Sequence, residues 1–189
     1  MASESVLLLL PEPVTCFRDA SYNQIQKFEI SEGGSAVILD WITSGRISRG
    51  EEWEFSRYYS VNDIWHNGKR IAKDVTLLVN DHDHNARVPD RPLRKKLQPY
   101  SCYAMLILYG PRVHSIMADL ISQYDKISIL KSNVPSQLIW SISPIDPTGQ
   151  GIVVRVGGVE TETVKAWLKK ALSGIEQIMG TAAYRRVFP

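Results

Sequence analysis

The four residues Asp81-His82-Asp83-His84 are the densest group of metal-ligating side chains in the sequence. Imidazole and carboxylate groups are ligands that nickel and zinc accept. On an extended chain, His82 and His84 point to one face and the two aspartates to the other, so only two ligands converge. The segment also lies in a polar stretch, residues 81–94, that contains two prolines. A solvated loop is therefore our preferred interpretation, and a metal site is the alternative.

The other histidines and the two cysteines are isolated in sequence. His66 and His114 have no ligand beside them, which favours surface or capping roles. Cys102 lies in an apolar run and is interpreted as a core residue, and no neighbour of Cys16 would activate its thiol. A Cys–His pair that forms only in space stays open as an alternative. The sequence contains no Gly-x-Ser-x-Gly elbow, phosphate loop or dinucleotide fingerprint, so no motif indicates an enzyme.

A charged segment lies between two tryptophans. Arg46, Arg49 and Glu51 are interspersed with two glycines, and Trp41 and Trp53 flank them. One interpretation is a strand, a corner and a second strand, tied by an Arg–Glu pair. The other is a contact patch for a protein partner, because Arg and Trp are favoured at interfaces. The residues alone leave both interpretations open.

The pattern of apolar residues predicts a mainly β fold with two α-helices toward the C-terminus. Alternation over residues 24–30 indicates a half-buried strand, and Asn67-Gly68 is the strongest hairpin signal because this pair readily supplies positive φ angles. Apolar residues recur at helical spacing over 113–124 and 160–179, which predicts the two helices. Further strands are predicted over residues 6–10, 36–42, 53–61, 61–65, 70–79, 102–108, 137–141 and 152–156.

Length and composition indicate a single globular domain over residues 1–189. The hydrophobic share of 44% is too high for a disordered chain, and the net charge of +2 gives no indication of a nucleic-acid partner. Two distant cysteines form no disulfide framework. The apolar run at 6–10 is too short for a signal peptide, and no run is long enough for a membrane span. We therefore expect a soluble, cytoplasmic protein with no membrane partner.

A series of short motifs, in order along almost the whole chain, resembles one protein family. A leucine-rich run leads into Leu-Pro-Glu-Pro-Val, and later motifs include Leu-Asp-Trp, Ser-Gly-Arg and Arg-Gly-Glu-Glu-Trp. Together they resemble the UreD family of urease accessory proteins, also called UreH, and in particular its fungal and plant members. The motifs are Leu7–Val14, Leu39–Trp41, Ser44–Arg46, Arg49–Trp53, Leu106–Pro111, Gly151–Val156 and Trp167-Leu168.

The resemblance implies an extended, β-helix-like architecture of stacked sheets and a function in urease maturation instead of catalysis. UreD-like proteins bind apo-urease and the accessory protein UreF, which recruits the GTPase UreG, and the assembly delivers nickel to urease. The resemblance therefore implies no catalytic residue and no stably bound cofactor, with nickel only in transit. An internal nickel channel is also proposed for the family, and no residue of this chain is mapped onto it. Our candidates for partner contact or for the channel are Arg46, Arg49, Glu51, Trp53 and Asp63.

The chain departs from the family at its N-terminal end. Family members carry a substantial portion ahead of the Leu-Pro-x-Pro motif, whereas this chain starts almost at that motif. We therefore expect the chain to lack this portion, which would leave unpaired strand edges and exposed apolar faces. Residues 6–10 would then form a poorly protected edge.

Two functions of other classes stay as alternatives. One is a metal-dependent hydrolase on a mainly β fold that uses the His82/His84 loop. The other is a β-type carbohydrate-binding module that uses exposed tryptophans. Substituting both histidines separates the hydrolase from a scaffold, since only the hydrolase would lose its activity.

Overall fold

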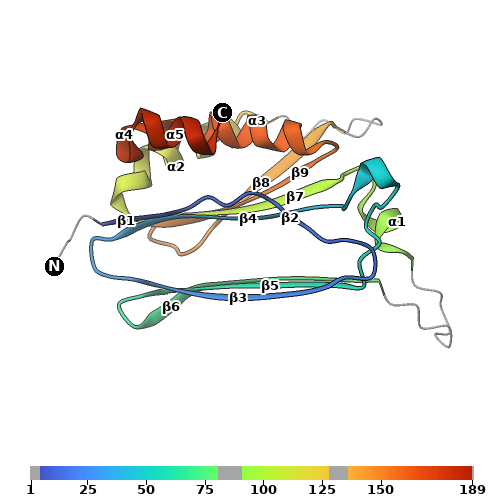
Figure 1. Ribbon diagram of the computed structural model, residues 1–189. Coiled ribbons are helices and arrows are strands. Elements are labelled where there is room, and N and C mark those ends of the chain that lie inside the picture. The colour runs from blue at the N-terminus through green and yellow to red at the C-terminus, as the bar shows by residue number, and fades with distance from the viewer. Residues whose placement is uncertain (1–4, 81–90, 128–135, 189) are drawn as a thin grey trace.

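Two stacked β-sheets form the body of the protein, and helices cover the outer face of the larger sheet (Figure 1). The computed structural model describes residues 5–80, 91–127 and 136–188. Strands predominate among these residues, so the mainly β fold predicted from the sequence is confirmed, together with the stacked sheets that the resemblance implies.

The larger sheet, which we call sheet A, consists of β1 (Val6–Leu9), β2 (Val14–Thr15), β4 (Ser35–Thr43), β7 (Cys102–Tyr109), β8 (Leu138–Pro144) and β9 (Gly151–Gly158). Its strand order is β1-β4-β7-β9-β8, and β2 pairs with β4 beyond the end of β1. Strands β1 and β2 run parallel to β4, whereas all the other neighbours are antiparallel. Strand β8 therefore forms one edge of the sheet.

The smaller sheet, sheet B, consists of β3 (Ser21–Ile30), β5 (Arg57–His66) and β6 (Lys69–Val79). Strand β5 lies in the middle, parallel to β3 and antiparallel to β6. Asn67 and Gly68 join β5 to β6 with φ angles of 49° and 73°, which confirms the predicted hairpin. The predicted alternation over 24–30 is also confirmed, because Phe28 packs between the sheets while Lys27 is exposed.

The helices are α1 (Leu93–Leu97), α2 (His114–Tyr124), α3 (Thr161–Ala171), α4 (Glu176–Met179) and α5 (Thr181–Val187), with 3-10 turns η1 (Ile47–Arg49), η2 (Pro111–Val113) and η3 (Ser173–Ile175). Both predicted helices are present, but η3 divides the one predicted over 160–179 into α3 and α4. Gly174 accounts for the break, since glycine is a poor helix former and a Cβ there would lie 2.8 Å from Ile116 Cγ1. Helix α1 begins inside the stretch 81–94 that we predicted as a loop. In the described part of the chain, no helix has the length and apolarity that a membrane crossing requires.

Strand β4 is buried along its whole length because both faces of sheet A are covered. Val37, Leu39 and Trp41 belong to the apolar cluster under the helices, whereas Ile38 and Ile42 face sheet B. This double coverage explains why apolar residues lie on both faces of β4 instead of alternating with polar ones, with Asp40 as the one charged residue of the strand.

Candidate functional site

A carboxylate lies buried between the two sheets. Asp40, in the middle of β4, is 8% exposed and faces β5. It accepts hydrogen bonds from the Tyr58 hydroxyl at 3.2 Å, the Asn62 amide at 2.7 Å and the Ser60 hydroxyl. The three donors occupy alternate positions of β5, so all of them point into the space between the sheets. All the hydrogen bonds to this buried carboxylate thus come from neutral hydroxyl and amide groups.

The polar contacts continue into β3. The Gln24 amide donates to Gln26 Oε1 at 3.1 Å and to the Ser60 hydroxyl at 3.4 Å, and the Tyr22 hydroxyl donates to Gln24 Oε1 at 2.7 Å. The polar residues therefore form a continuous row across β4, β5 and β3. We call this row the Asp40 layer; it consists of Tyr22, Gln24, Gln26, Asp40, Tyr58, Ser60 and Asn62.

The Asp40 layer offers oxygen atoms to a cation. Burial raises the pKa of Tyr58, and the nearby Asp40 carboxylate raises it further, so the phenol stays a hydrogen-bond donor. Asn62 Oδ1 is buried and has no hydrogen-bond partner among the described residues. The same part of the chain contains no group of three or more His, Cys, Asp or Glu side chains that could hold a metal ion. A divalent cation would therefore find a carboxylate and an amide oxygen here, a set too small for tight binding.

The predicted Arg–Glu pair closes the turn between β4 and β5. Arg46 donates from Nε and Nη2 to the two carboxylate oxygens of Glu51, at 2.8 Å and 2.6 Å, which is a bidentate geometry. These hydrogen bonds lower the pKa of Glu51, and the backbone N–H of Arg18 contributes. The Arg46 guanidinium also lies 4.1 Å from the ring centroid of Phe17. Arg49, in η1, is exposed at the tip of this turn.

Trp53 supports the turn from inside the core. Its side chain is 2% exposed, and its Nε1 donates to the Tyr100 carbonyl at 3.0 Å. The ring packs edge-on against Phe55, with centroids 6.0 Å apart. Because the backbone turns at Trp53 with a φ of 57°, β5 begins only at Arg57. The strand predicted over 53–61 is therefore wrong in its first four residues.

Asp63 lies on a different surface from this turn. It follows Asn62 along β5, so its side chain points to the outer face of sheet B. Arg70 donates to both of its oxygens, at 2.8 Å and 3.0 Å, and this pairing lowers the pKa of Asp63. The structure therefore brings Arg46 and Glu51 together and places Asp63 apart from them.

The remaining sequence candidates fall into two groups. His82 and His84 lie outside the described residues. Both cysteines are buried free thiols, and burial raises the pKa of Cys102 to about 12 and also raises that of Cys16. Cys102 is 0% exposed, which confirms its interpretation as a core residue. Neither thiol has the lowered pKa that a nucleophilic cysteine needs.

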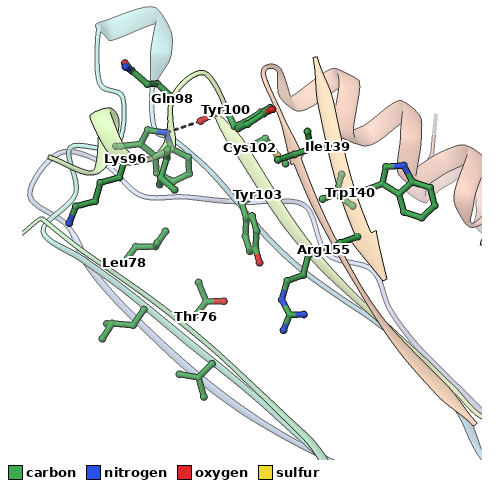
Figure 2. A pocket seen from close by; sticks show the side chains of 17 residues that line it. Thr76, Leu78, Lys96, Gln98, Tyr100, Cys102, Tyr103, Ile139, Trp140 and Arg155 are labelled. Carbon is green, nitrogen blue, oxygen red and sulfur yellow. Dashed lines mark hydrogen bonds between the residues drawn. The ribbon is translucent and has the colours of Figure 1, made fainter. Parts of the chain in front are cut away.

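An open groove of about 660 Å³ lies between the sheets on the side of β6 and β8. Figure 2 shows Tyr103 and Arg155 pointing from sheet A into this space, with Thr76 on the opposite wall. Arg155 donates to Asp74 of β6, so one ion pair connects the two walls. Trp53 lies at the end of the groove where α1 packs.

Sequence analysis identified the turn but missed Asp40 and its donors. One signal was present, since Asp40 interrupts the otherwise apolar run of residues 36–42. A charge at such a position requires partners when both faces of the sheet are buried. Those partners follow 18 to 22 residues later in β5, and the sequence does not show that the two strands face each other.

Comparison with known proteins gives consistent matches. The family model described as "UreD urease accessory protein" matches residues 1–188. Urease accessory protein 4 of Cryptococcus neoformans is 33% identical over 98% of this chain and 60% of its own length. Urease accessory protein D of Oryza sativa subsp. indica is 31% identical over 97% of this chain and 64% of its own length. UreD of Sorangium cellulosum is 32% identical over 96% of this chain and 53% of its own length.

The chain thus spans between 53% and 64% of the length of these three relatives. The family match extends over nearly every residue, and its motifs coincide with the elements described above: the Leu-Asp-Trp motif contains Asp40, and the Arg-Gly-Glu-Glu-Trp motif contains Glu51 and Trp53. The chain belongs to the UreD family of urease accessory proteins.

Proposed function

We propose that this chain is a non-catalytic scaffold of urease maturation that works in the cytoplasm. Its partners in this proposal are the urease apoprotein and accessory proteins of the UreF and UreG types. Support comes from family membership and from the names of its relatives, which are urease accessory proteins of fungi, plants and bacteria. The two buried free thiols accord with a reducing compartment.

The Asp40 layer is the part of the molecule that we assign to nickel in transit. The observation that carries this assignment is a buried carboxylate held only by hydroxyl and amide donors. Hydroxyl and amide groups can turn an oxygen toward a cation, and Asn62 Oδ1 already lacks a partner among the described residues. Few oxygen ligands favour brief residence, which suits a cargo that must be passed on to urease.

The turn between β4 and β5 is the surface that we assign to partner contact. Arg49 and Ile47 are exposed at its tip, and Ile47 is 56% exposed. Arg46 and Glu51 fix the backbone beneath them, with Trp53 buried behind. A rigid turn that presents an arginine and an aliphatic side chain is suited to protein recognition. Asp63, paired with Arg70 on the outer face of sheet B, is a second and separate candidate.

Co-expression tests the scaffold directly. The tagged chain is produced with UreF-type and UreG-type proteins and apo-urease from one organism, and both co-purification and urease activity are measured. Co-purification together with active urease is the expected result. If the chain, and also a version of the length of its relatives, binds none of these proteins, the assignment is wrong.

No observation favours either alternative function. The carbohydrate-binding module relied on exposed tryptophans, but Trp41 and Trp53 are buried, and Trp65, Trp140 and Trp167 are each partly buried. Substitution of both His82 and His84 by alanine tests whether the chain is a hydrolase. We expect urease activation to persist in this variant, whereas loss of a hydrolytic activity of the chain would favour the hydrolase.

A further inference from the structure

The polar side chains between the two sheets continue beyond the Asp40 layer toward β6. In sheet B, Asn62 of β5 is the cross-strand neighbour of Asp74 of β6, and both side chains face sheet A. In sheet A, Met105 separates Asp40 from Arg155 along one row of cross-strand neighbours. Asn62 bonds to Asp40, and Asp74 bonds to Arg155. Two carboxylates therefore flank Asn62, one from each sheet.

Asn62 has an unsatisfied oxygen at this place. The residue is 1% exposed, and its Nδ2 donates to Asp40 at 2.7 Å, but its Oδ1 has no hydrogen-bond partner among the described residues. A buried amide oxygen without a donor costs free energy, which a bound cation would recover. The Cβ atoms of cross-strand neighbours lie about 5 Å apart, so the Asp74 carboxylate is within reach of the same cation. The amide oxygen and the two carboxylates can thus form a set of three oxygen ligands.

Arg155 keeps Asp74 out of this set. Its guanidinium donates to Asp74 Oδ1, and the Asp74 side chain is 10% exposed. Burial raises the pKa of Tyr103, and the neighbouring Arg155 partly offsets this effect through its charge and a hydrogen bond. Both side chains point from sheet A toward sheet B (Figure 2). A cation that used Asp74 would therefore have to displace a guanidinium that has partners on both sheets.

The charge of Arg155 also acts on Asp40 itself. The two residues are two strands apart, which corresponds to about 10 Å along the sheet. Charges at this separation are only partly screened, and less so where the intervening side chain is buried, as Met105 is. A fixed positive charge at this distance weakens the attraction of a divalent cation to Asp40.

We propose that Arg155 is an internal counter-ion that keeps cation binding in the Asp40 layer weak. It occupies Asp74 and so withholds a second carboxylate from a cation held by Asp40 and Asn62. The inference rests on the proposed function, in which nickel passes through this layer, and it gives the physical reason for a brief residence. Arg155 acts through Asp74 as a positioning residue and does not touch the cation.

Titration of the whole chain with Ni²⁺ alone, followed by calorimetry, tests the counter-ion. Arg155→Leu has neither a charge nor a ligand atom at this position, so Asp74 is released. We expect this variant to bind Ni²⁺ about tenfold more tightly than the unchanged chain, or better, because affinity rises with the number of charged ligands. Asp74→Asn or Asp40→Asn, each added to Arg155→Leu, should cancel the gain. Arg155→Lys keeps the positive charge and should keep the weak binding.

Arg94→Leu is the matched control for the loss of an arginine from an ion pair. Arg94 of α1 lies 2.8 Å from Glu52, outside the Asp40 layer, so this variant also releases a carboxylate. It should leave the affinity for Ni²⁺ unchanged. Circular dichroism checks that the variants fold. If Arg155→Leu does not fold, Arg155→Gln takes its place, because its uncharged amide can still donate to Asp74, with Asp74→Asn in that background as the control.

Three results would overturn the inference. These are an unchanged affinity when Arg155 is replaced by a neutral residue, an equal gain in Arg94→Leu, and a gain that persists when Asp40 or Asp74 is also replaced. The titration needs no urease, so its outcome is separate from that of the nickel assignment.

The co-expression system distinguishes the two failures. If Asp40→Asn deprives urease of nickel while Arg155→Leu gains no affinity, the counter-ion role is wrong and the nickel assignment stands. If Arg155→Leu gains affinity through Asp40 while Asp40→Asn still yields nickel-loaded urease, the nickel assignment is wrong and the counter-ion role stands.

Discussion

The two faces of sheet A differ in what covers them. On the helix side, α2, α3 and α5 cover an apolar cluster that includes Leu106 and Leu168, both 0% exposed. On the side of sheet B, apolar packing is interrupted by the Asp40 layer, and beyond β6 the face is open. The same strands thus contribute to one large apolar cluster on the helix side and, on the side of sheet B, to two smaller buried clusters that Asp40 separates at β4. This division suggests that the helix side maintains the fold, while the side of sheet B is available for function.

Cavity formation on the helix side should have the largest effect on stability. Leu106→Ala removes a fully buried side chain of β7, and we expect the free energy of unfolding to fall by about 3 kcal/mol. Ile139→Ala, on the open part of the other face, should cost about 1 kcal/mol or less. Urea denaturation of both variants measures the difference. Equal losses would mean that Ile139 is as tightly packed as Leu106.

Two adjacent glycines of β9 sharpen the comparison, because their side-chain positions face opposite sides. A Cβ at Gly158 would lie 2.4 Å from Val164 Cγ2, whereas a Cβ at Gly157 would meet nothing closer than 3.4 Å. Gly158→Ala should therefore destabilise the protein by about 2 kcal/mol, and Gly157→Ala should change little. Thermal unfolding distinguishes the two. If Gly157→Ala lowered the thermal stability more than Gly158→Ala, the groove side of β9 would be more closely packed than the helix side.

The smallest expected effect concerns the Arg46–Glu51 pair, in which the Arg46 side chain is 31% and the Glu51 side chain 9% exposed. Hydrogen bonds from Arg46 lower the pKa of Glu51, so the folded state favours the carboxylate form. This contribution to stability is present above the usual pKa range of glutamate and is lost as pH falls through the lowered value. Arg46→Met should reduce Tm at neutral pH, and its deficit should shrink between about pH 5 and pH 3.

The Glu51→Gln variant provides the control for this pH dependence. It keeps the shape of the side chain but cannot titrate, so Arg46→Met in that background should show a deficit that is constant over the same pH range. A deficit of the single variant that grew as pH fell would contradict the lowered pKa of Glu51.

Local signals predicted much of the fold. The Asn67-Gly68 turn needs positive φ at adjacent positions, and residues 36–42 were predicted as a strand, so both features follow from the residues themselves. The break at Gly174 was missed because helical periodicity continues across it. Strand pairing could not be predicted, because β3 pairs with β5 although β4 lies between them in the sequence and belongs to the other sheet. Asp40 was missed for the same reason, because its donors are distant in sequence.

The central claim is that the Asp40 layer acts in nickel transit within a maturation scaffold. Asp40→Asn, tested in the co-expression system, addresses it most directly, with co-purification and urease activity measured on the same samples. Gly157→Ala, a change on the same side of sheet A outside the layer, is the control. We expect Asp40→Asn to retain its partners but to yield urease with little nickel and little activity. Fully active, nickel-loaded urease with Asp40→Asn would contradict the account.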